Sequence, residues 1–260
     1  MKDAWQPDQY AKFEAERSKP FHDLAAGVGI LPAGARILDL GCGTGELTAT
    51  LHRKFSARET VGVELSPAML AKSGPVAAAN PGLRFVPGDL ATFADDEGFD
   101  LVFANASLQW VDDHPAVLRR WRDLLRPGGK LAVQVPANQD YPTHTLCARM
   151  VAESPWREKL GEAERPPTVL KPETYATTLF GIGYRDVRVR LEVYAHVFPD
   201  RSSVVEWVKG TLLTFVRARL SDSDYSGFLD EFRARLFREL PDERPFLYPF
   251  KRILFWAWRG

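Results

Sequence analysis

Cysteine and net charge are both scarce in this chain. Only Cys42 and Cys147 occur among 260 residues, and their separation matches neither a zinc-binding pattern nor a CxxC pair. The sequence therefore indicates reduced thiols and no metal site. Lysine plus arginine and aspartate plus glutamate both number 34, so the net charge is zero. This balance gives no electrostatic reason to expect a nucleic-acid or membrane-surface partner.

Long apolar runs are absent as well. No stretch approaches the roughly 18 residues that a membrane-spanning helix needs, and the opening MKDAWQPDQY has no apolar segment of a secretory signal. We therefore expect a cytoplasmic protein. No feature of the sequence indicates an obligate protein partner.

The other predicted elements can be interpreted relative to one stretch, RILDLGCGTG at positions 36–45. A short apolar run typical of a buried parallel strand leads into three alternating glycines, Gly41, Gly43 and Gly45, and helix-forming residues follow at 46–54. In such a turn a ligand can approach the backbone closely, and the following helix presents its free N–H groups. The pattern predicts a strand, a ligand-binding turn and a helix.

Strands and helices alternate along the first half of the chain. Further strands are expected at 59–64, 83–86, 99–104 and 130–135, and helices at 68–79 and 114–125. Residues 8–26 favour an amphipathic helix that Pro20 interrupts. This alternation predicts an α/β fold with a doubly wound, mostly parallel sheet. Polar ligand groups then gather where strands end, which is where Asp39, Glu64, Asp89 and Asn105 fall.

The pattern changes after Pro136. Residues 138–175 contain five prolines and one expected helix at 143–152. An alternating strand is expected at 185–197, long helices at 202–220 and 222–240, and an aromatic strand at 246–258. We interpret 138–178 and 199–244 as helical lid insertions within a single domain spanning 1–260.

The details of the glycine turn narrow the choice of ligand. A dinucleotide fingerprint would need glycine where Glu46 stands, and a P-loop would need a Gly-Lys-Ser/Thr ending that is missing. Asp39, before the first glycine, would repel a pyrophosphate. An acid about twenty residues beyond the turn, Glu64, is placed to accept hydrogen bonds from ribose hydroxyls. A cationic ligand with a ribose and no phosphate is favoured.

Together with GVELSP at 62–67, PGDL at 87–90 and the RPGG turn at 126–129, the glycine motif resembles the class I S-adenosylmethionine (AdoMet)-dependent methyltransferases. The resemblance implies a seven-stranded sheet whose last strand is antiparallel. It also implies AdoMet as cofactor, with the turn against its methionine part, Glu64 on the ribose, the adenine near Asp89 and Leu90, and Asn105 and Ala106 beside the sulfonium. The full set of expected cofactor-binding residues is Asp39, Gly41, Cys42, Gly43, Gly45, Glu64, Leu65, Asp89, Leu90, Asn105, Ala106, Trp5 and Arg17.

A narrower resemblance covers nearly the whole chain. The segments around Trp5 and Arg17, FANASLQW at 103–110, LAVQVPAN at 131–138, PTH at 142–144 and PFKRILFWAWR at 249–259 are similar to those of the trans-aconitate 2-methyltransferases. That resemblance implies esterification of one carboxylate of a small tricarboxylic acid. The alternatives are a methyltransferase for another acceptor, such as a phenol or a quinone precursor, and a non-catalytic AdoMet- or carboxylate-binding module.

Esterification would explain why the sequence offers no clear catalytic base. A carboxylate with a pKa near 4 is already ionised at neutral pH, so alignment with the methyl group can supply most of the catalysis. We therefore assign no catalytic residue. Side chains that can hold the acid are needed instead, with arginine favoured for its bidentate geometry. The expected acid-binding residues are Arg17, Trp110, His144, Arg149, Arg217 and Arg252.

Overall fold

The computed structural model describes residues 14–161 and 168–260, with side chains from residue 18 onward. The described chain divides into two compact units. The sheet unit contains residues 15–137, 168–192 and 252–260, and the helical unit contains 138–161 and 193–251 together with residue 14. Within the described ranges, no helix is long and apolar enough to cross a membrane.

The seven strands form one sheet in the order β3-β2-β1-β4-β5-β7-β6. The first five pair in parallel, and β7 runs antiparallel to β5, so the predicted doubly wound sheet with an antiparallel last strand is confirmed. The strands are β1 Arg36–Leu40, β2 Glu59–Glu64, β3 Leu83–Pro87, β4 Phe99–Asn105, β5 Leu125–Pro136, β6 Tyr184–Phe198 and β7 Phe246–Arg259.

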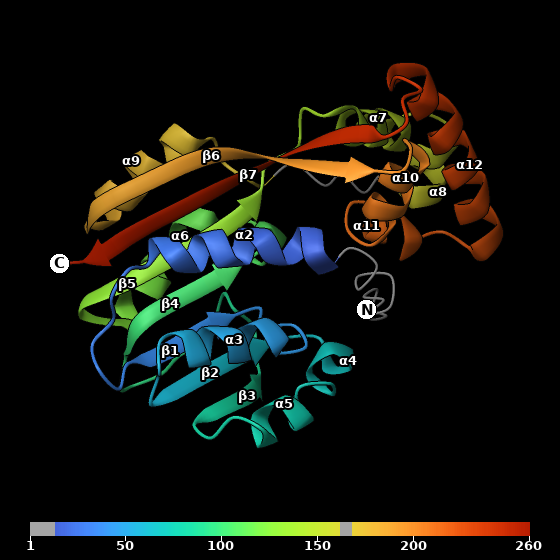
Figure 1. Cartoon of the computed structure of the whole chain (residues 1–260). Coiled ribbons are helices and arrows are strands. Elements are labelled where there is room, and N and C mark those ends of the chain that lie inside the picture. Colours follow the sequence, from blue (N-terminus) through green and yellow to red (C-terminus); the bar gives the residue numbers. More distant parts are fainter. Residues whose placement is uncertain (1–13, 162–167) are drawn as a thin grey trace. The chain divides into compact units, whose positions relative to one another are not determined.

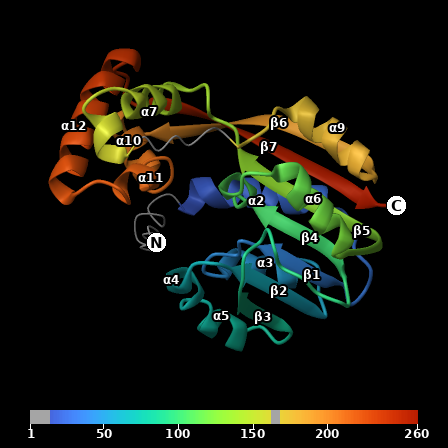
Figure 2. The ribbon, with the colours of Figure 1, turned by 180° about the vertical axis from the view of Figure 1, so that it is seen from behind.

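Helices cover both faces of the sheet in the sheet unit. Helices α2 (Glu14–Gly27) and α3 (Glu46–Lys54) lie on one face, and α6 (His114–Asp123) and α9 (Pro172–Ile182) lie on the other (Figures 1 and 2). The short α4 (Pro67–Leu70), α5 (Gly74–Ala78) and η1 (Leu108–Trp110) complete the unit.

Two expectations about helix continuity were wrong. Pro20 lies inside α2 without ending it. The helix expected over 68–79 is two short helices, because Ser73-Gly74-Pro75 restarts the chain with proline in the first turn of α5.

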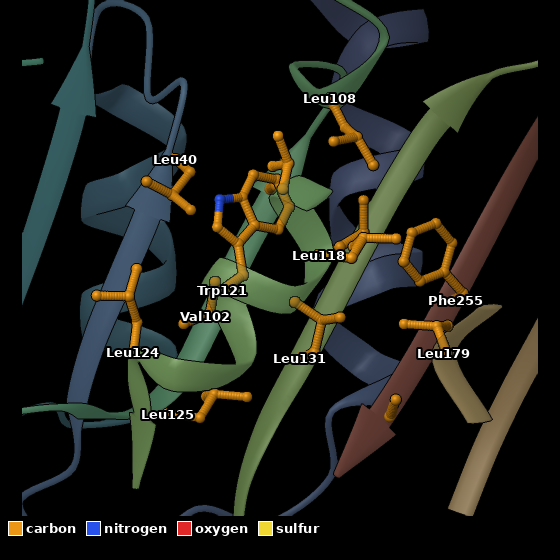
Figure 3. Close-up of a cluster of buried hydrophobic side chains, with 14 of the residues drawn as sticks. Leu40, Val102, Leu108, Leu118, Trp121, Leu124, Leu125, Leu131, Leu179 and Phe255 are labelled. Atoms are coloured by element: carbon orange, nitrogen blue, oxygen red, sulfur yellow. The ribbon is translucent and has the colours of Figure 1, made fainter. Parts of the chain in front are cut away.

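The core of the sheet unit lies between the sheet and α6. Trp121 is fully buried, and the close-up shows it with Leu118, Leu131 and Phe255 (Figure 3). Its indole N–H also donates to the carbonyl of Leu90 (2.8 Å), which ties α6 to the loop after β3. Burial of such large side chains stabilises the fold by roughly 1.5–3 kcal/mol each. The carboxyl ends of the strands are thereby held in fixed positions.

A buried ion cluster fixes the opposite end of β1. The Arg36 side chain is 3% exposed and pairs with Glu59 and Asp95, each at 2.5 Å. Hydrogen bonding to Asp95 raises the pKa of Arg36, and the same arginine lowers the pKa of Asp95. The pairs join β1 to β2 and to the loop before β4.

The helical unit has a core of its own. Its helices are α7 (Pro142–Ala152), α8 (Trp156–Leu160), α10 (Ser202–Lys209), α11 (Thr214–Arg217) and α12 (Asp222–Glu239). Trp207, Phe228 and Phe232 of these helices are buried there with Tyr248 of β7. The helix expected over 202–220 is interrupted after Lys209, where Gly210 follows.

The predicted lid segments coincide only partly with the helical unit. Residues 168–178, expected in a lid, belong to the sheet unit, where α9 packs on α6 through Tyr175 and Leu179. Proline is abundant before α9, but Pro172 stands at its first turn, where proline is well tolerated.

Candidate functional site

The sheet has a topological switch point between β1 and β4. The strand order proceeds from β1 to β2 and β3 on one side and from β4 to β5 on the other. In open parallel sheets, ligands bind outside the carboxyl ends of the strands at such a point. The glycine turn follows β1 there, and the loop 105–110 follows β4.

The glycine turn has a backbone that only glycine adopts easily. Gly41, Gly43 and Gly45 all have positive φ angles, of 80°, 60° and 87°. A Cβ at Gly41 would lie 2.3 Å from that of Ser107, and one at Gly45 would lie 2.3 Å from the ring of Phe85. The turn is therefore packed closely against the loop after β4 and against the Phe85 side chain of β3.

Glu64 is held at the end of β2 by two backbone donors. Its carboxylate accepts hydrogen bonds from the N–H of Gly43 (2.9 Å) and of Ser66 (2.8 Å). A carboxylate has about four acceptor positions, so capacity remains for two ribose hydroxyls. The glycine turn is thus hydrogen-bonded directly to Glu64, the residue expected to bind the ribose.

Asp39 lies behind the turn, 4% exposed, and accepts a hydrogen bond from the Thr48 hydroxyl (2.6 Å). Burial, with a contribution from the Glu64 charge, raises the pKa of Asp39 to about 7, although the Thr48 bond acts in the opposite direction. Burial and the two neighbouring carboxylates also raise the pKa of the Cys42 thiol. The thiol is therefore protonated and not a nucleophile.

The loop after β4 is tied to the glycine turn. Ser107 donates to the carbonyl of Leu40 (2.6 Å), and Ala106 has a positive φ of 54°, which is strained for a residue other than glycine. The amide nitrogen of Gln109 donates to the carbonyl of Ala106 (2.6 Å). This bond fixes the orientation of the Gln109 amide and leaves its buried Oε1 without a partner in the described part of the chain.

A buried polar group at the end of β5 was not predicted. Gln134 is fully buried and pairs in register with Asn105 on β4, and its Oε1 accepts a hydrogen bond from Arg252 Nη1 (3.3 Å). Gln134 Nε2 and Asn105 Oδ1 are buried without hydrogen-bond partners among the described residues. Buried polar atoms normally have partners, so their presence together at the strand ends indicates a ligand site.

The residues present fit AdoMet. Two carboxylates, Asp39 and Glu64, and the unpartnered oxygens of Asn105 and Gln109 suit a ligand that carries ammonium, sulfonium and hydroxyl groups. Among the described residues no group of histidine, cysteine or acidic side chains could hold a metal ion.

Comparison with known proteins agrees with this chemistry. Residues 37–129 match the family model described as a methyltransferase domain. A trans-aconitate 2-methyltransferase of Deinococcus radiodurans is 43% identical over 259 residues, covering 98% of each chain. One from Variovorax paradoxus is 39% identical, covering 91% of this chain and 90% of its own. The chain belongs to the trans-aconitate 2-methyltransferase family.

Solved structures show the same fold at low sequence identity. Haemonchus contortus phosphoethanolamine N-methyltransferase 2 in complex with S-adenosyl-L-methionine aligns with a TM-score of 0.57 at 18% identity, covering 93% of this chain and 52% of that one. A geranyl diphosphate methyltransferase in complex with SAM also gives 0.57, at 17% identity, covering 97% and 89%. Class I methyltransferase architecture is thus established for this family member.

The residues expected near the adenine, Asp89 and Leu90, follow β3, and the expected cofactor-binding residue Leu65 follows β2. Asp89 is exposed, and its Oδ1 accepts a hydrogen bond from the N–H of Ala91 (2.8 Å). Leu65 is 69% exposed, and Leu90 packs partly against the core. Trp110 is half-buried at the end of η1. Trp5 and the side chain of Arg17 fall outside the described part, so their assignments stay predictions.

The expected acid-binding residues are divided between the two units. Arg252 is 5% exposed beside Gln134 in the sheet unit. In the helical unit Arg149 pairs with Glu239, and Arg217 pairs with Asp222 (2.5 Å). Burial lowers the pKa of His144 to about 4, so its ring is neutral at physiological pH. Arg149 and Arg217 would have to leave their carboxylate partners before they could form ion pairs with an acid. His144 would have to gain a proton.

His114, a histidine that a hydroxyl acceptor could have used as a base, is enclosed in the core. It is fully buried, and its Nδ1 hydrogen-bonds with the Tyr175 hydroxyl (2.7 Å). Burial lowers its pKa. This pair joins α6 to α9, which is a structural role.

Proposed function

We propose that the protein transfers the methyl group of AdoMet to a carboxylate of trans-aconitate, forming a methyl ester. The observation that carries the proposal is the group of unpartnered buried atoms at the ends of β4 and β5, next to the glycine turn and Glu64. Family membership supports the acceptor.

The polar atoms divide by chemistry into two sets. The acceptors Asn105 Oδ1 and Gln109 Oε1 suit donor groups of the cofactor, whereas the donor Gln134 Nε2 suits a carboxylate oxygen. Arg252, hydrogen-bonded to the same Gln134 side chain, adds positive charge on that side. We therefore assign Gln134 and Arg252 to the acceptor carboxylates. His144, Arg149, Arg217, Trp110 and Arg17 stay proposed contributors.

Catalysis by these residues is chiefly positioning. Bound AdoMet supplies an electrophilic methyl group on a cationic sulfur, and transfer to a carboxylate oxygen moves no proton. The buried amide of Gln134 and the guanidinium of Arg252 orient the acid in a region from which water is excluded. Well-oriented groups can contribute up to roughly 7–11 kcal/mol in this way.

An acceptor panel tests the proposal. The protein is incubated with methyl-labelled AdoMet and, separately, trans-aconitate, cis-aconitate, citrate, isocitrate and a phenol. We expect rapid labelling of trans-aconitate, slower labelling of the other acids and none of the phenol. Preferential labelling of the phenol would contradict the acceptor assignment while leaving the cofactor assignment intact.

A further inference from the structure

A cavity lies within the sheet unit, on α2 and strands β5, β6 and β7. Its volume is about 660 Å³. The carboxyl end of α2, the beginning of the regular part of β5 and the outer strands β6 and β7 enclose it. The charged and aromatic side chains that line it are Asp23, Lys130, Arg188, Arg190, Glu192, Trp256 and Trp258.

Strand register places the part of this cavity around Lys130 and Trp258 away from the methyl-transfer site. Trp258 pairs with Lys130, and Leu254, which lines the other end of the cavity, pairs with Gln134 four residues further along β5. At about 3.3 Å per residue, Lys130 and Gln134 are roughly 13 Å apart along the strand. None of the residues assigned to AdoMet or to the acid lines the cavity.

Three cations gather on the two indoles. Arg188 Cζ lies 4.9 Å and Lys130 Nζ 5.7 Å from the centre of the Trp258 ring, and Arg190 Cζ lies 5.5 Å from that of Trp256. Among the described residues none of the three cations forms an ion pair. Burial and the Arg188 charge lower the pKa of Lys130, as expected for like charges held together.

Helix capping explains part of this cluster. Lys130 donates to the carbonyls of Val28 (2.9 Å) and Ile30 (2.7 Å), and Arg188 donates to that of Gly27 (3.3 Å), so both stabilise the negative end of α2. Arg190 makes no such bond in the described structure, and its guanidinium fork is free to bind an anion. Helix capping therefore does not explain why Arg190 lies in this cavity or why three cations are grouped there.

We infer that this cavity binds a small organic polyanion, with its carboxylate or phosphate groups on Arg188 and Arg190 and its carbon skeleton against the half-buried indole of Trp258. Arginine forks match the geometry of both anions. The carboxylates of Glu192 and Asp23 also line the cavity and repel an anion. Together with the three cations they leave one net positive charge. The site therefore prefers a ligand with several anionic groups.

Isothermal titration of the full chain with citrate and, separately, inorganic pyrophosphate tests the inference. Sodium chloride holds the ionic strength constant. The variants are Arg190→Gln, Glu192→Gln and, as a matched control, Arg233→Gln, an exposed arginine of α12 that pairs with Asp230. Circular dichroism and AdoMet affinity confirm that each variant is folded.

We expect Arg190→Gln to weaken binding of the polyanion at least tenfold, Glu192→Gln to tighten it severalfold and Arg233→Gln to leave it unchanged. Methyl transfer should stay the same in all three variants. Citrate can also occupy the acceptor site, so only citrate binding that Arg190→Gln weakens is assigned to this cavity. Such binding of citrate alone assigns a carboxylate ligand, and such binding of pyrophosphate alone assigns a phosphate ligand. Binding of neither anion, or equal affinity in the wild type, Arg190→Gln and Glu192→Gln, would overturn the inference.

Discussion

Replacing Asp39 with asparagine should stabilise the cofactor-free protein while weakening cofactor binding. The Asp39 carboxylate is 4% exposed, and burial raises its pKa from the usual 3.8 to about 7. A shift of about 3 units corresponds to about 4 kcal/mol of unfavourable free energy for the buried charge. Asparagine keeps an oxygen for the Thr48 hydroxyl and carries no charge.

The sign of the effect follows from proton binding. Between pH 3.8 and about 7 the folded protein holds a proton on Asp39 that the unfolded chain has released, so this group lowers stability as pH rises. The advantage of Asp39→Asn should be close to zero below pH 4. It should reach about 2 kcal/mol at pH 5 and about 4 kcal/mol at pH 8.

Urea unfolding of the apo protein at pH 5 and pH 8, followed by circular dichroism, measures this difference. Asp89→Asn is the matched control for stability, because it removes an exposed carboxylate near the end of another strand. A stability difference for Asp39→Asn that does not grow between pH 5 and pH 8 would refute the reasoning. The same substitution should weaken AdoMet binding about tenfold at pH 8, since a negative charge behind the turn that holds a cationic ligand is lost.

Three further predictions concern the acceptor, the turn and the ion cluster. Gln134→Leu should raise the KM for trans-aconitate about 10- to 100-fold, because a hydrogen bond to a charged group contributes about 1.5–3 kcal/mol. AdoMet affinity, measured by direct titration, should be unchanged. An unchanged KM would show that Gln134 does not bind the acid. Gly45→Ala should cost about 2–5 kcal/mol of stability in urea unfolding, from the positive φ and the Phe85 contact. Arg36→Ala should cost about 3–5 kcal/mol because Glu59 and Asp95 lose their partner. Since Arg36 lowers the pKa of Asp95, the wild-type advantage over Arg36→Ala should decline as the pH falls through the range in which Asp95 titrates, which a pH series of unfolding curves would show.

The local part of the cofactor site was predictable from the sequence. A strand, a glycine turn and a helix follow one another within twenty residues, so their order and the position of Gly41 relative to β1 depend only on neighbouring residues. Glu64 could be placed for the same reason, because it ends the next strand. Helix breaks were harder, since Pro20 is accommodated within α2 while Gly74-Pro75 restarts a helix.

The acceptor side could not be derived from local pattern. The importance of Gln134 depends on its pairing with Asn105 and its bond to Arg252, which is 118 residues away along the chain. One signal was available, because a glutamine inside the apolar run LAVQV is unusual for a strand buried on both faces. The cavity lined by Arg190 and Trp258 gives no local signal in the sequence, since its residues come from α2, β5, β6 and β7.

The chemical nature of the product tests the central claim most directly. After incubation with methyl-labelled AdoMet and trans-aconitate, the labelled product is isolated and treated with mild alkali. A carboxyl methyl ester releases all of its label as volatile methanol, and we expect that result. Label that survives alkali, as in an ether or an N-methyl group, or the absence of any labelled acid, would contradict carboxyl methylation by this protein.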